Sequence, residues 1–400
     1  MEKDVASPHL EMKAPRFVLY TVCISPHQMP LMKRIVNALG TNSCKYVYTH
    51  KLEGIGRKEL GWTEVQESWI LCEQAEPAEA KHVLENCSVL MSGIRDFDLF
   101  ELRKRKGLVT LYSSERWFKP IILKTPLGEI HIPGIVKLLF PSYFRMAWRF
   151  RKLLKEKNPN SFFYLPIGLN ASRDAALICC GSSQIDFHRQ VGAPPKDREE
   201  PWQNRLRIWG YFVEPSSVAA DELRHLREMQ YKKINSGQRH LRILWVGRML
   251  ALKHVDTIVK ALKLITQKGI PMSLTLVGDG PERQRLQKLS KGLPVEFHSF
   301  VPISQVREIM RAHDLYVFAS NSFDGWGAVV SEAFEEMMPV LASRQCGAGP
   351  TTLPDECLFD CKNARELAER ILDFEKLPKI DASRWSAKAA SDYLLQIFLK

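Results

Sequence analysis

Long hydrophobic runs are absent from this sequence of 400 residues. No segment reaches the roughly 18 uncharged apolar residues that a membrane-spanning helix needs. Residues 1–16 mix acids, bases and prolines and contain no apolar stretch typical of a signal peptide. We therefore expect a cytoplasmic protein.

Paired cysteine motifs are absent, which argues against covalent or metal cross-links. The nine cysteines include no Cys-x-x-Cys pair. Several lie in apolar runs that resemble strands, namely Cys23, Cys72, Cys179 and Cys180. These features predict reduced thiols in the core, with neither a disulfide framework nor a zinc site.

Low-complexity tracts and solenoid repeats are also missing, and the composition is that of a globular protein, with 45% hydrophobic and 26% charged residues. Because a single core rarely grows beyond about 250–300 residues, we expect two domains. We assign residues 1–215 to the first domain and 216–383 to the second. Residues 384–400 are predicted to form a C-terminal helix that has the option of packing back on the first domain.

Acidic residues are rare in one region of the chain. The formal net charge is +12, and the segment from Arg103 to Lys157 contains 14 Lys and Arg against three acids, a net charge of +11. The rest of the chain is therefore nearly neutral. We expect this region to face an anionic partner.

Short apolar segments alternate with helical ones along most of the chain. In the second half the predicted strands are 241–247, 274–280, 295–300, 315–320 and 339–343, and in the first half they are 16–22, 45–50, 88–93, 108–114, 162–168, 176–182 and 207–213. Helices are predicted at 254–267, within 215–237 and at 386–399. This pattern indicates an α/β protein with two Rossmann-like domains, whose parallel sheets face a central cleft that binds the ligand.

Two glycine-containing turns follow the first strands of the second domain. Gly247-Arg248 is followed by Lys253, and two cations at this spacing on a strand-to-helix turn suit a diphosphate. A solvated basic turn is the alternative. The next turn carries Gly278 and Gly280, which allow a close approach of the backbone to a ligand.

The segment from Asp324 to Glu332 combines two carboxylates with a glycine-bearing loop. Asp324 can accept bonds from sugar hydroxyls, the amides of Gly325, Trp326 and Gly327 can meet a phosphate at a helix N-terminus, and Glu332 can reach a ribose. An N-cap Asp and a surface Glu are the alternative. A later loop of small residues, 345–350, is expected only to clear space.

Together these motifs resemble the nucleotide-binding half of a retaining glycosyltransferase of family 4 (group 1), which has the GT-B fold. The resemblance covers residues 241–375 and consists of VGR with a following Lys, VGDGP, a VxF strand, and the two-carboxylate segment, closed by Pro339-Val340. It implies that Arg248 and Lys253 hold the donor diphosphate, that Glu332 binds the ribose, and that Asp324 contacts the transferred sugar.

The sequence departs from the family pattern at three positions. Asp324 stands where the family has Glu, His254 replaces a frequent Gly after the Lys, and Ser299 stands where Gly is common. In the first domain, His27 with Gln28 and Glu115 with Arg116 resemble the cleft-facing loops of some bacterial members. A packing role is the alternative for His27.

A DxD sequence, Asp96-Phe97-Asp98, matches the metal signature of the other glycosyltransferase fold. It follows a predicted strand and begins a helical stretch, where Asp is a common N-cap. We therefore predict a structural role for Asp96, and we expect neither a metal ion nor another cofactor.

Helical periodicity places the apolar residues of 143–157 on one face and basic residues toward the other. Arg145, Trp148, Arg149 and Lys152 are candidates for contact with an anionic membrane surface. The alternative is that the apolar face packs on the first domain and the bases are only solvated. No nucleic-acid-binding module is recognisable, so nucleic acid is not expected as the partner.

The sequence thus predicts an enzyme that transfers a sugar from a nucleotide-diphosphate donor to a glycan or lipid-linked acceptor. The first domain would bind the acceptor and the second the donor. The resemblance implies retention of configuration, in cell-surface polysaccharide or lipopolysaccharide assembly, at the inner face of the cytoplasmic membrane. Two alternatives remain, a nucleotide-sugar epimerase of the same fold and a non-catalytic protein that binds polyanions at the membrane.

Overall fold

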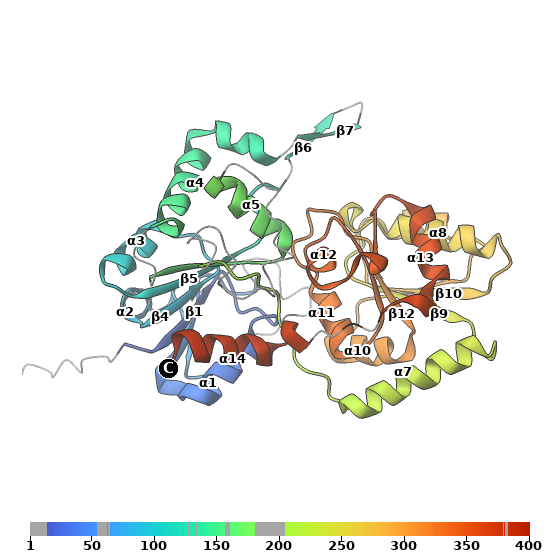
Figure 1. The fold of residues 1–400 in the computed structure, drawn as a ribbon, viewed down its shortest axis with the longest axis horizontal. Helices are drawn as coiled ribbons and strands as arrows, with labels where there is room; N and C mark the ends of the chain where they lie inside the picture. Colours follow the sequence, from blue (N-terminus) through green and yellow to red (C-terminus); the bar gives the residue numbers. More distant parts are fainter. Residues whose placement is uncertain are drawn as a thin grey trace, which may run out of the picture.

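The computed structural model describes residues 14–53, 62, 65–119, 121–125, 128–132, 134–156, 161–180, 205–378, 380 and 383–400. It contains two six-stranded sheets and a two-stranded ribbon. Every pairing within the two large sheets is parallel, and Figure 1 shows the sheets in separate lobes. The predicted α/β fold class with two parallel-sheet units is confirmed.

The first sheet has the strand order β3-β2-β1-β4-β5-β8. Its strands are β1 (Phe17–Thr21), β2 (Cys44–Tyr48), β3 (Ile70–Cys72), β4 (Val89–Ser92), β5 (Val109–Ser114) and β8 (Phe162–Pro166). The helices of this half are α1 (Met29–Leu39), α2 (Pro77–Asn86), α3 (Phe97–Arg105), α4 (Pro141–Leu154) and α5 (Leu169–Cys180). The antiparallel ribbon, β6 (Ile121–Thr125) with β7 (Gly128–Ile132), projects from the lobe (Figure 1).

The second sheet repeats this arrangement with the order β11-β10-β9-β12-β13-β14. Its strands are β9 (Leu241–Val246), β10 (Met272–Val277), β11 (Val295–His298), β12 (Leu315–Phe318), β13 (Val340–Ser343) and β14 (Leu358–Phe359). The helices are α7 (Ala220–Asn235), α8 (Val255–Thr266), α9 (Arg283–Leu289), α10 (Ile303–Ala312), α11 (Ala328–Glu335), α12 (Ala348–Thr352) and α13 (Ala364–Leu372).

Two predicted strands of the first half were wrong. Residues 176–180 form the end of α5. The strand was predicted wrongly because a short apolar run has the same pattern in a buried helix and in a buried strand. Residues 207–213 form no strand, and the segment pairs with the first sheet only through isolated bridges from Leu206 and Trp209. The short strand β3 and the β6–β7 ribbon were not predicted.

The C-terminal helix α14 (Ala387–Phe398) lies against α1 at the first lobe (Figure 1). Ala387, Ala390 and Leu394 are buried in the same core as the residues of β1 and α1. At the end of the chain, Arg16 Nη2 donates to the carbonyl of Leu399 at 2.5 Å. The chain therefore crosses from the second lobe back to the first.

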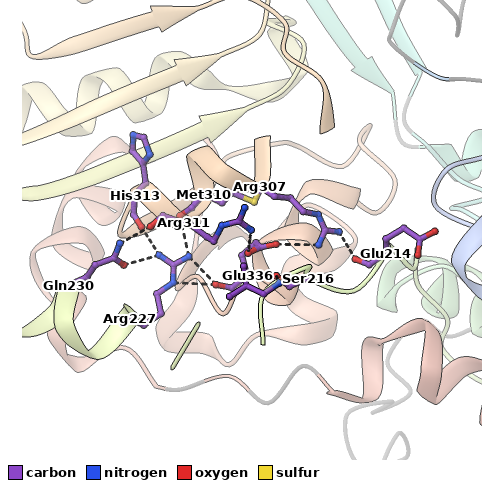
Figure 2. Close-up of polar contacts among 10 residues, drawn as sticks. Glu214, Ser216, Arg227, Gln230, Arg307, Met310, Arg311, His313 and Glu336 are labelled. Carbon is purple, nitrogen blue, oxygen red and sulfur yellow. Dashed lines mark hydrogen bonds and ion pairs between the residues drawn. The ribbon is translucent and has the colours of Figure 1, made fainter. Parts of the chain in front are cut away.

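The segment that leads into the second lobe is anchored by Arg307 of α10 (Figure 2). Its guanidinium donates to the main-chain carbonyl of Glu214 at 2.5 Å and pairs with the buried carboxylate of Glu336 at 3.3 Å. Arg311 Nη1 approaches the other oxygen of Glu336 at 2.9 Å. The Glu214 carboxylate is in turn paired with Lys33 of α1 at 3.1 Å.

Arg227 of α7 completes this polar cluster. It donates to the carbonyl of Met310 in the last turn of α10 and to those of His313 and Glu336, which directly follow α10 and α11 (Figure 2). Burial lowers the pKa of Arg227 to about 10. The carbonyl oxygens compensate for the water that the guanidinium loses, so this side chain ties three helices together.

The structure shows free thiols at Cys44, Cys72, Cys87, Cys346, Cys357 and Cys361. Burial raises the pKa of Cys346 to about 12 and that of Cys87 to about 11, which keeps both protonated at neutral pH. In the described parts of the chain, no three His, Cys, Asp or Glu side chains are grouped so as to hold a metal ion. None of the described helices is long and apolar enough to cross a bilayer.

Candidate functional site

The loops after β9 and β10 pack against each other, backbone to backbone. Gly278 donates its amide to the carbonyl of His298 at 3.0 Å and has φ +130°, a conformation that favours glycine. A Cβ at this position would clash with the carbonyl oxygen of Gly247. Met249 N donates to Asp279 O at 2.8 Å, which fixes the two turns to each other. The predicted donor glycines Gly247, Gly278 and Gly280 therefore lie in one compact group.

The charged side chains around these turns differ in exposure and in ion pairing. Lys253 Nζ is ion-paired with Asp324 Oδ2, and it lies 5.4 Å from the centre of the Phe318 ring. The side chain of Arg248 is exposed. The structure thus brings Lys253, which follows β9, together with Asp324, which follows β12. Arg248 lies on the same turn after β9 as Lys253.

Helix α11 begins beside this ion pair. Its N-cap residue Gly327 has φ +91°, and a Cβ there would collide with the Phe318 ring. The side chain of the N-cap position is only hydrogen, so no side chain caps the first amides of the helix. These amides and the helix dipole provide a favourable position for an anion next to Lys253.

Glu332 lies inside α11 and is only 6% exposed. Burial raises its pKa to about 7, and the charge of Arg307 opposes that shift. The phenol of Tyr316 is fully buried nearby, and its pKa is raised by burial and by the negative charges of Glu332 and Asp324. Glu332 therefore carries a proton for part of the time near neutral pH, and it remains able to accept a hydrogen bond in either form.

Trp326 has a different position from the rest of the Asp324–Glu332 segment. Its side chain is 1% exposed, contacts Trp385 with ring centres 5.6 Å apart, and donates from Nε1 to Ser331 Oγ at 2.9 Å. A Cβ on Gly210 would approach its ring to 2.8 Å. The indole is a packing group of the core in this structure, and only its backbone adjoins the site.

Glu115 of the first domain reaches the second domain at this point. Its Oε1 accepts from Tyr211 OH at 2.8 Å and its Oε2 from Lys119 Nζ at 2.7 Å. Lys119 also donates to the carbonyl of Phe323 at 3.4 Å. A Cβ on Gly325 would overlap the carboxylate of Glu115. Glu115 is thus held directly against the loop that carries Asp324.

His27 lies in the same region, stacked on Tyr211 with ring centres 5.8 Å apart and edge-on to Trp62 at 5.6 Å. Gln28 precedes α1, and among the described residues its buried Oε1 has no hydrogen-bond partner. Arg116 is directed elsewhere, because its guanidinium pairs with Asp174 at 3.4 Å and the other carboxylate oxygen of Asp174 accepts from Phe118 N. Of the four predicted first-domain residues, Glu115 is the one that this structure shows against the second-domain loop of Gly325.

The two domains also meet through the backbones of Gly168 and Gly347. A Cβ on Gly168 would lie 3.1 Å from Gly347 O. Leu169 N donates to Thr351 Oγ1 at 2.8 Å across the same boundary. Within the second domain, a Cβ on Gly347 would overlap Gly325 O. Tyr211 and Lys119 were not predicted from the sequence. A glycine that follows a strand in each half was a signal of a close backbone contact, but the sequence did not show which residue it contacts.

Asp96 of the DxD sequence is the N-cap of α3, where its side chain accepts from Leu99 N at 2.9 Å. The carboxylate of Asp98 pairs with Arg149 of α4 at 2.7 Å. The predicted structural role of Asp96 is confirmed, and Asp98 serves to attach α4.

Comparisons with known proteins show which proteins this chain resembles. Residues 227–392 match the family model described as glycosyl transferases group 1. Sulfoquinovosyl transferase SQD2 of Arabidopsis thaliana is 28% identical over 153 residues, which are 38% of this chain and 28% of that protein. Alpha-D-kanosaminyltransferase of Streptomyces kanamyceticus is 27% identical over 39% of this chain and 45% of its own length. The chain thus spans less than half the length of these relatives.

A third relative is a GDP-mannose-dependent alpha-(1-6)-phosphatidylinositol dimannoside mannosyltransferase of Mycobacterium tuberculosis, 28% identical over 24% of this chain and 26% of that protein. Solved structures match over nearly the whole chain. Anabaena Alr3699/HepE, in complex with UDP and glucose, has a TM-score of 0.54 at 13% identity, covering 95% of this chain and 98% of that one. A trehalose 6-phosphate synthase of Burkholderia multivorans has a TM-score of 0.55 at 10% identity, with 96% and 98% covered. These structures establish a shared fold.

Proposed function

We propose that the protein transfers a sugar from a nucleotide-diphosphate donor to an acceptor hydroxyl. The proposal is supported by residues 227–392, which match the family model of group 1 glycosyl transferases. The observation that carries the proposal is the ion pair of Lys253 and Asp324 beside the N-terminus of α11. A cation, helix amides and a carboxylate at one place match the diphosphate and the sugar hydroxyls of such a donor.

In this reaction the bond between the sugar and the diphosphate breaks, and negative charge accumulates on the leaving diphosphate. Lys253, Arg248 and the first amides of α11 would stabilise that charge, as preorganised donors do in other group transfers. Asp324 would orient the sugar through its hydroxyls, and Glu332 would accept a bond from the ribose. These roles require no metal ion or other cofactor, since the protein supplies the positive charge.

The first domain would contribute the acceptor side and exclude water. Glu115, Lys119 and Tyr211 lie against the loop of Phe323 and Gly325. A barrier to water at this point would protect the donor from hydrolysis. His27, stacked on Tyr211, is positioned to line the acceptor side.

We further propose retention of the anomeric configuration and a glycan or lipid-linked acceptor, in cell-surface polysaccharide or lipopolysaccharide assembly on the cytoplasmic side of the membrane. Two named relatives support alpha-linked transfer and a lipid-linked acceptor, because one is a GDP-mannose-dependent alpha-(1-6) mannosyltransferase of a phosphatidylinositol dimannoside and the other is an alpha-D-kanosaminyltransferase. The same relatives favour transfer over the epimerase and over the non-catalytic polyanion-binding protein.

The proposal is tested by measuring ligand-induced thermal stabilisation with UDP, GDP, ADP and their sugar conjugates. A ligand that binds the folded state alone raises its stability according to affinity and concentration. We expect one nucleotide class to raise the melting temperature of the wild type and to have less effect on Glu332→Ala. That conjugate should then be consumed only when an acceptor is added. Stabilisation by none of them would refute the proposal, and turnover without acceptor would favour the epimerase.

A further inference from the structure

Helix α4 has apolar side chains on two faces, and only one of these faces is covered. Ala147, Phe150, Leu153 and Leu154 are buried in the core, as expected for the apolar face predicted from the sequence. On the other side, Phe140 is 56% exposed, Phe144 59% and Trp148 56%. Their spacing of four residues aligns them in one ridge along the helix. Leu139, just before it, is 80% exposed.

The charged residues of the chain segment that carries this ridge all have one sign. Residues 134–155 contain six Lys and Arg and no acid. Arg145, Arg151 and Lys152 are exposed, and Lys152 Nζ lies 5.5 Å from the centre of the Trp148 ring. Arg149 differs, because its guanidinium is bound by Asp98 at 2.7 Å and by Glu101 at 2.9 Å. The inclusion of Arg149 among the membrane candidates is therefore corrected: its ion pairs attach α4 to α3.

Figure 1 places α4 at the outer edge of the first lobe, away from the second sheet. The ridge is thus separate from the loops that carry Lys253 and Asp324. Exposed aromatic side chains gathered in one patch are unusual on a monomeric protein and mark a contact surface. The surrounding bases determine which kind of contact is favoured, since an anionic surface complements them.

We propose that this membrane-docking patch, formed by Leu139, Phe140, Phe144 and Trp148 with Arg145 and Lys152, binds the surface of an anionic lipid bilayer. The apolar side chains enter the boundary between headgroups and acyl chains, where aromatic rings are well accommodated. Arg145 and Lys152 remain at the level of the lipid phosphates. The helix lies in the plane of the surface, because its other face stays packed on the protein core.

This arrangement would hold the first lobe on a membrane without a spanning segment. The inference does not depend on the transfer reaction, and it can succeed or fail independently of it. If the transfer reaction also holds, the patch would concentrate the enzyme where a lipid-linked acceptor is found.

The test is co-sedimentation of the full chain with vesicles of phosphatidylcholine alone or mixed with phosphatidylglycerol. We expect the wild type to bind the mixed vesicles, with affinity that falls as salt increases. The double variant Phe144→Ser/Trp148→Ser should bind about tenfold more weakly or worse, because it removes two interfacial aromatic side chains. Arg145→Glu/Lys152→Glu should lose preference for the anionic lipid.

Matched controls lie on the second lobe. Phe300→Ser removes an aromatic side chain of comparable exposure, and Lys232→Glu/Lys233→Glu reverses two exposed charges on α7. Both should sediment like the wild type. All variants change exposed side chains, and unaltered circular dichroism and melting temperature would establish that they fold.

Equal binding of the wild type to both kinds of vesicle would overturn the proposal, as would wild-type binding by Phe144→Ser/Trp148→Ser. Sedimentation velocity without lipid checks whether a second copy of the chain covers the ridge instead. A dimer that the same double variant dissociates would also overturn it.

Discussion

Lys253 is ion-paired with Asp324 although 71 residues separate them in the chain. The pair forms because β9 and β12 are neighbours in the second sheet, so the loops beyond their carboxyl ends lie side by side. An ammonium group held by a carboxylate is positioned before any ligand arrives. This preorganisation is what a leaving diphosphate would require.

We expect Lys253→Ala to lower kcat about 100-fold or more at saturating donor, because one preorganised donor to a developing negative charge is typically worth that much. The measurement is initial velocity with the nucleotide sugar identified by thermal stabilisation. Lys260→Ala is the matched control, since Lys260 lies nearby on α8 and pairs only with Asp256 among the described side chains. Unchanged turnover in Lys253→Ala would refute the assigned role.

Stability should depend on pH through Glu332. Its pKa is raised from 4.5 to about 7 in the folded protein, so the folded state keeps a proton that the unfolded chain releases above pH 4.5. The stabilisation from the protonated carboxyl is present in full below pH 4.5 and is lost as the pH rises toward 7. The change is on the order of 3 kcal/mol.

Urea denaturation of wild type and Glu332→Gln across this pH range checks the prediction. Taking the difference between the two proteins removes the contributions of other groups, including His254 and His313, whose pKa values are lowered by burial. The wild type should lose stability relative to the variant as pH increases from 4.5 to 7. A difference independent of pH would show that Glu332 titrates normally.

The contact between Glu115 and Gly325 should be sensitive to one methyl group. In Gly325→Ala the new Cβ displaces the Glu115 carboxylate, which is the mobile end of a side chain. We expect a folded protein with kcat/KM lowered about tenfold to 100-fold, because the first domain no longer seats correctly against the loop of Asp324. In a Glu115→Ala background the same substitution should cost much less, which a double-mutant cycle detects.

Gly347→Ala provides the contrast. Its Cβ would meet the backbone oxygen of Gly325, which no side-chain rotation can relieve. A larger loss of activity is expected, together with a lower melting temperature, and Glu115→Ala should not rescue it. Rescue of both variants to the same degree would contradict this account of the contact.

Met337 adopts a left-handed backbone conformation, with φ +48°, after the end of α11. Glycine is preferred at such positions because a Cβ is strained there by roughly 1–2 kcal/mol. Met337→Gly should therefore raise the free energy of unfolding by up to about 1 kcal/mol, measured by urea denaturation. Leu264→Gly should lower it by a similar amount, since Leu264 is comparably exposed but lies within α8. Destabilisation by both changes would contradict the prediction.

Glu336 is completely buried between Arg307 and Arg311 (Figure 2). Glu336→Gln should destabilise the second domain by about 3–5 kcal/mol, because two guanidinium groups lose their buried counter-charge. Thermal unfolding measures the effect. Glu356→Gln is the control, with an exposed carboxylate in the same domain and little expected change. A melting temperature equal to that of the wild type in Glu336→Gln would refute the role of this cluster.

Much of the second domain was predictable from local pattern. The five predicted strands there correspond to β9 to β13, because each is a continuous apolar run bounded by turn residues. His254 replaces the family's frequent Gly but retains a backbone conformation that suits glycine, with φ +47°. In the first domain, the run at 176–182 had no feature to separate helix from strand, and its described part is helical.

The sequence by itself determined which chemistry each loop carries: cations after β9, glycines after β10, and two carboxylates around the start of α11. These features depend on the residue types within one loop. Their hydrogen-bonding groups and backbone preferences can be recognised from the local sequence. The tertiary structure alone decided that Glu115 meets Gly325, that Trp326 turns into the core, and that Arg149 is neutralised by α3 while Phe144 and Trp148 stay exposed. Those outcomes depend on how sheets and helices pack over long sequence separations, which no local pattern specifies.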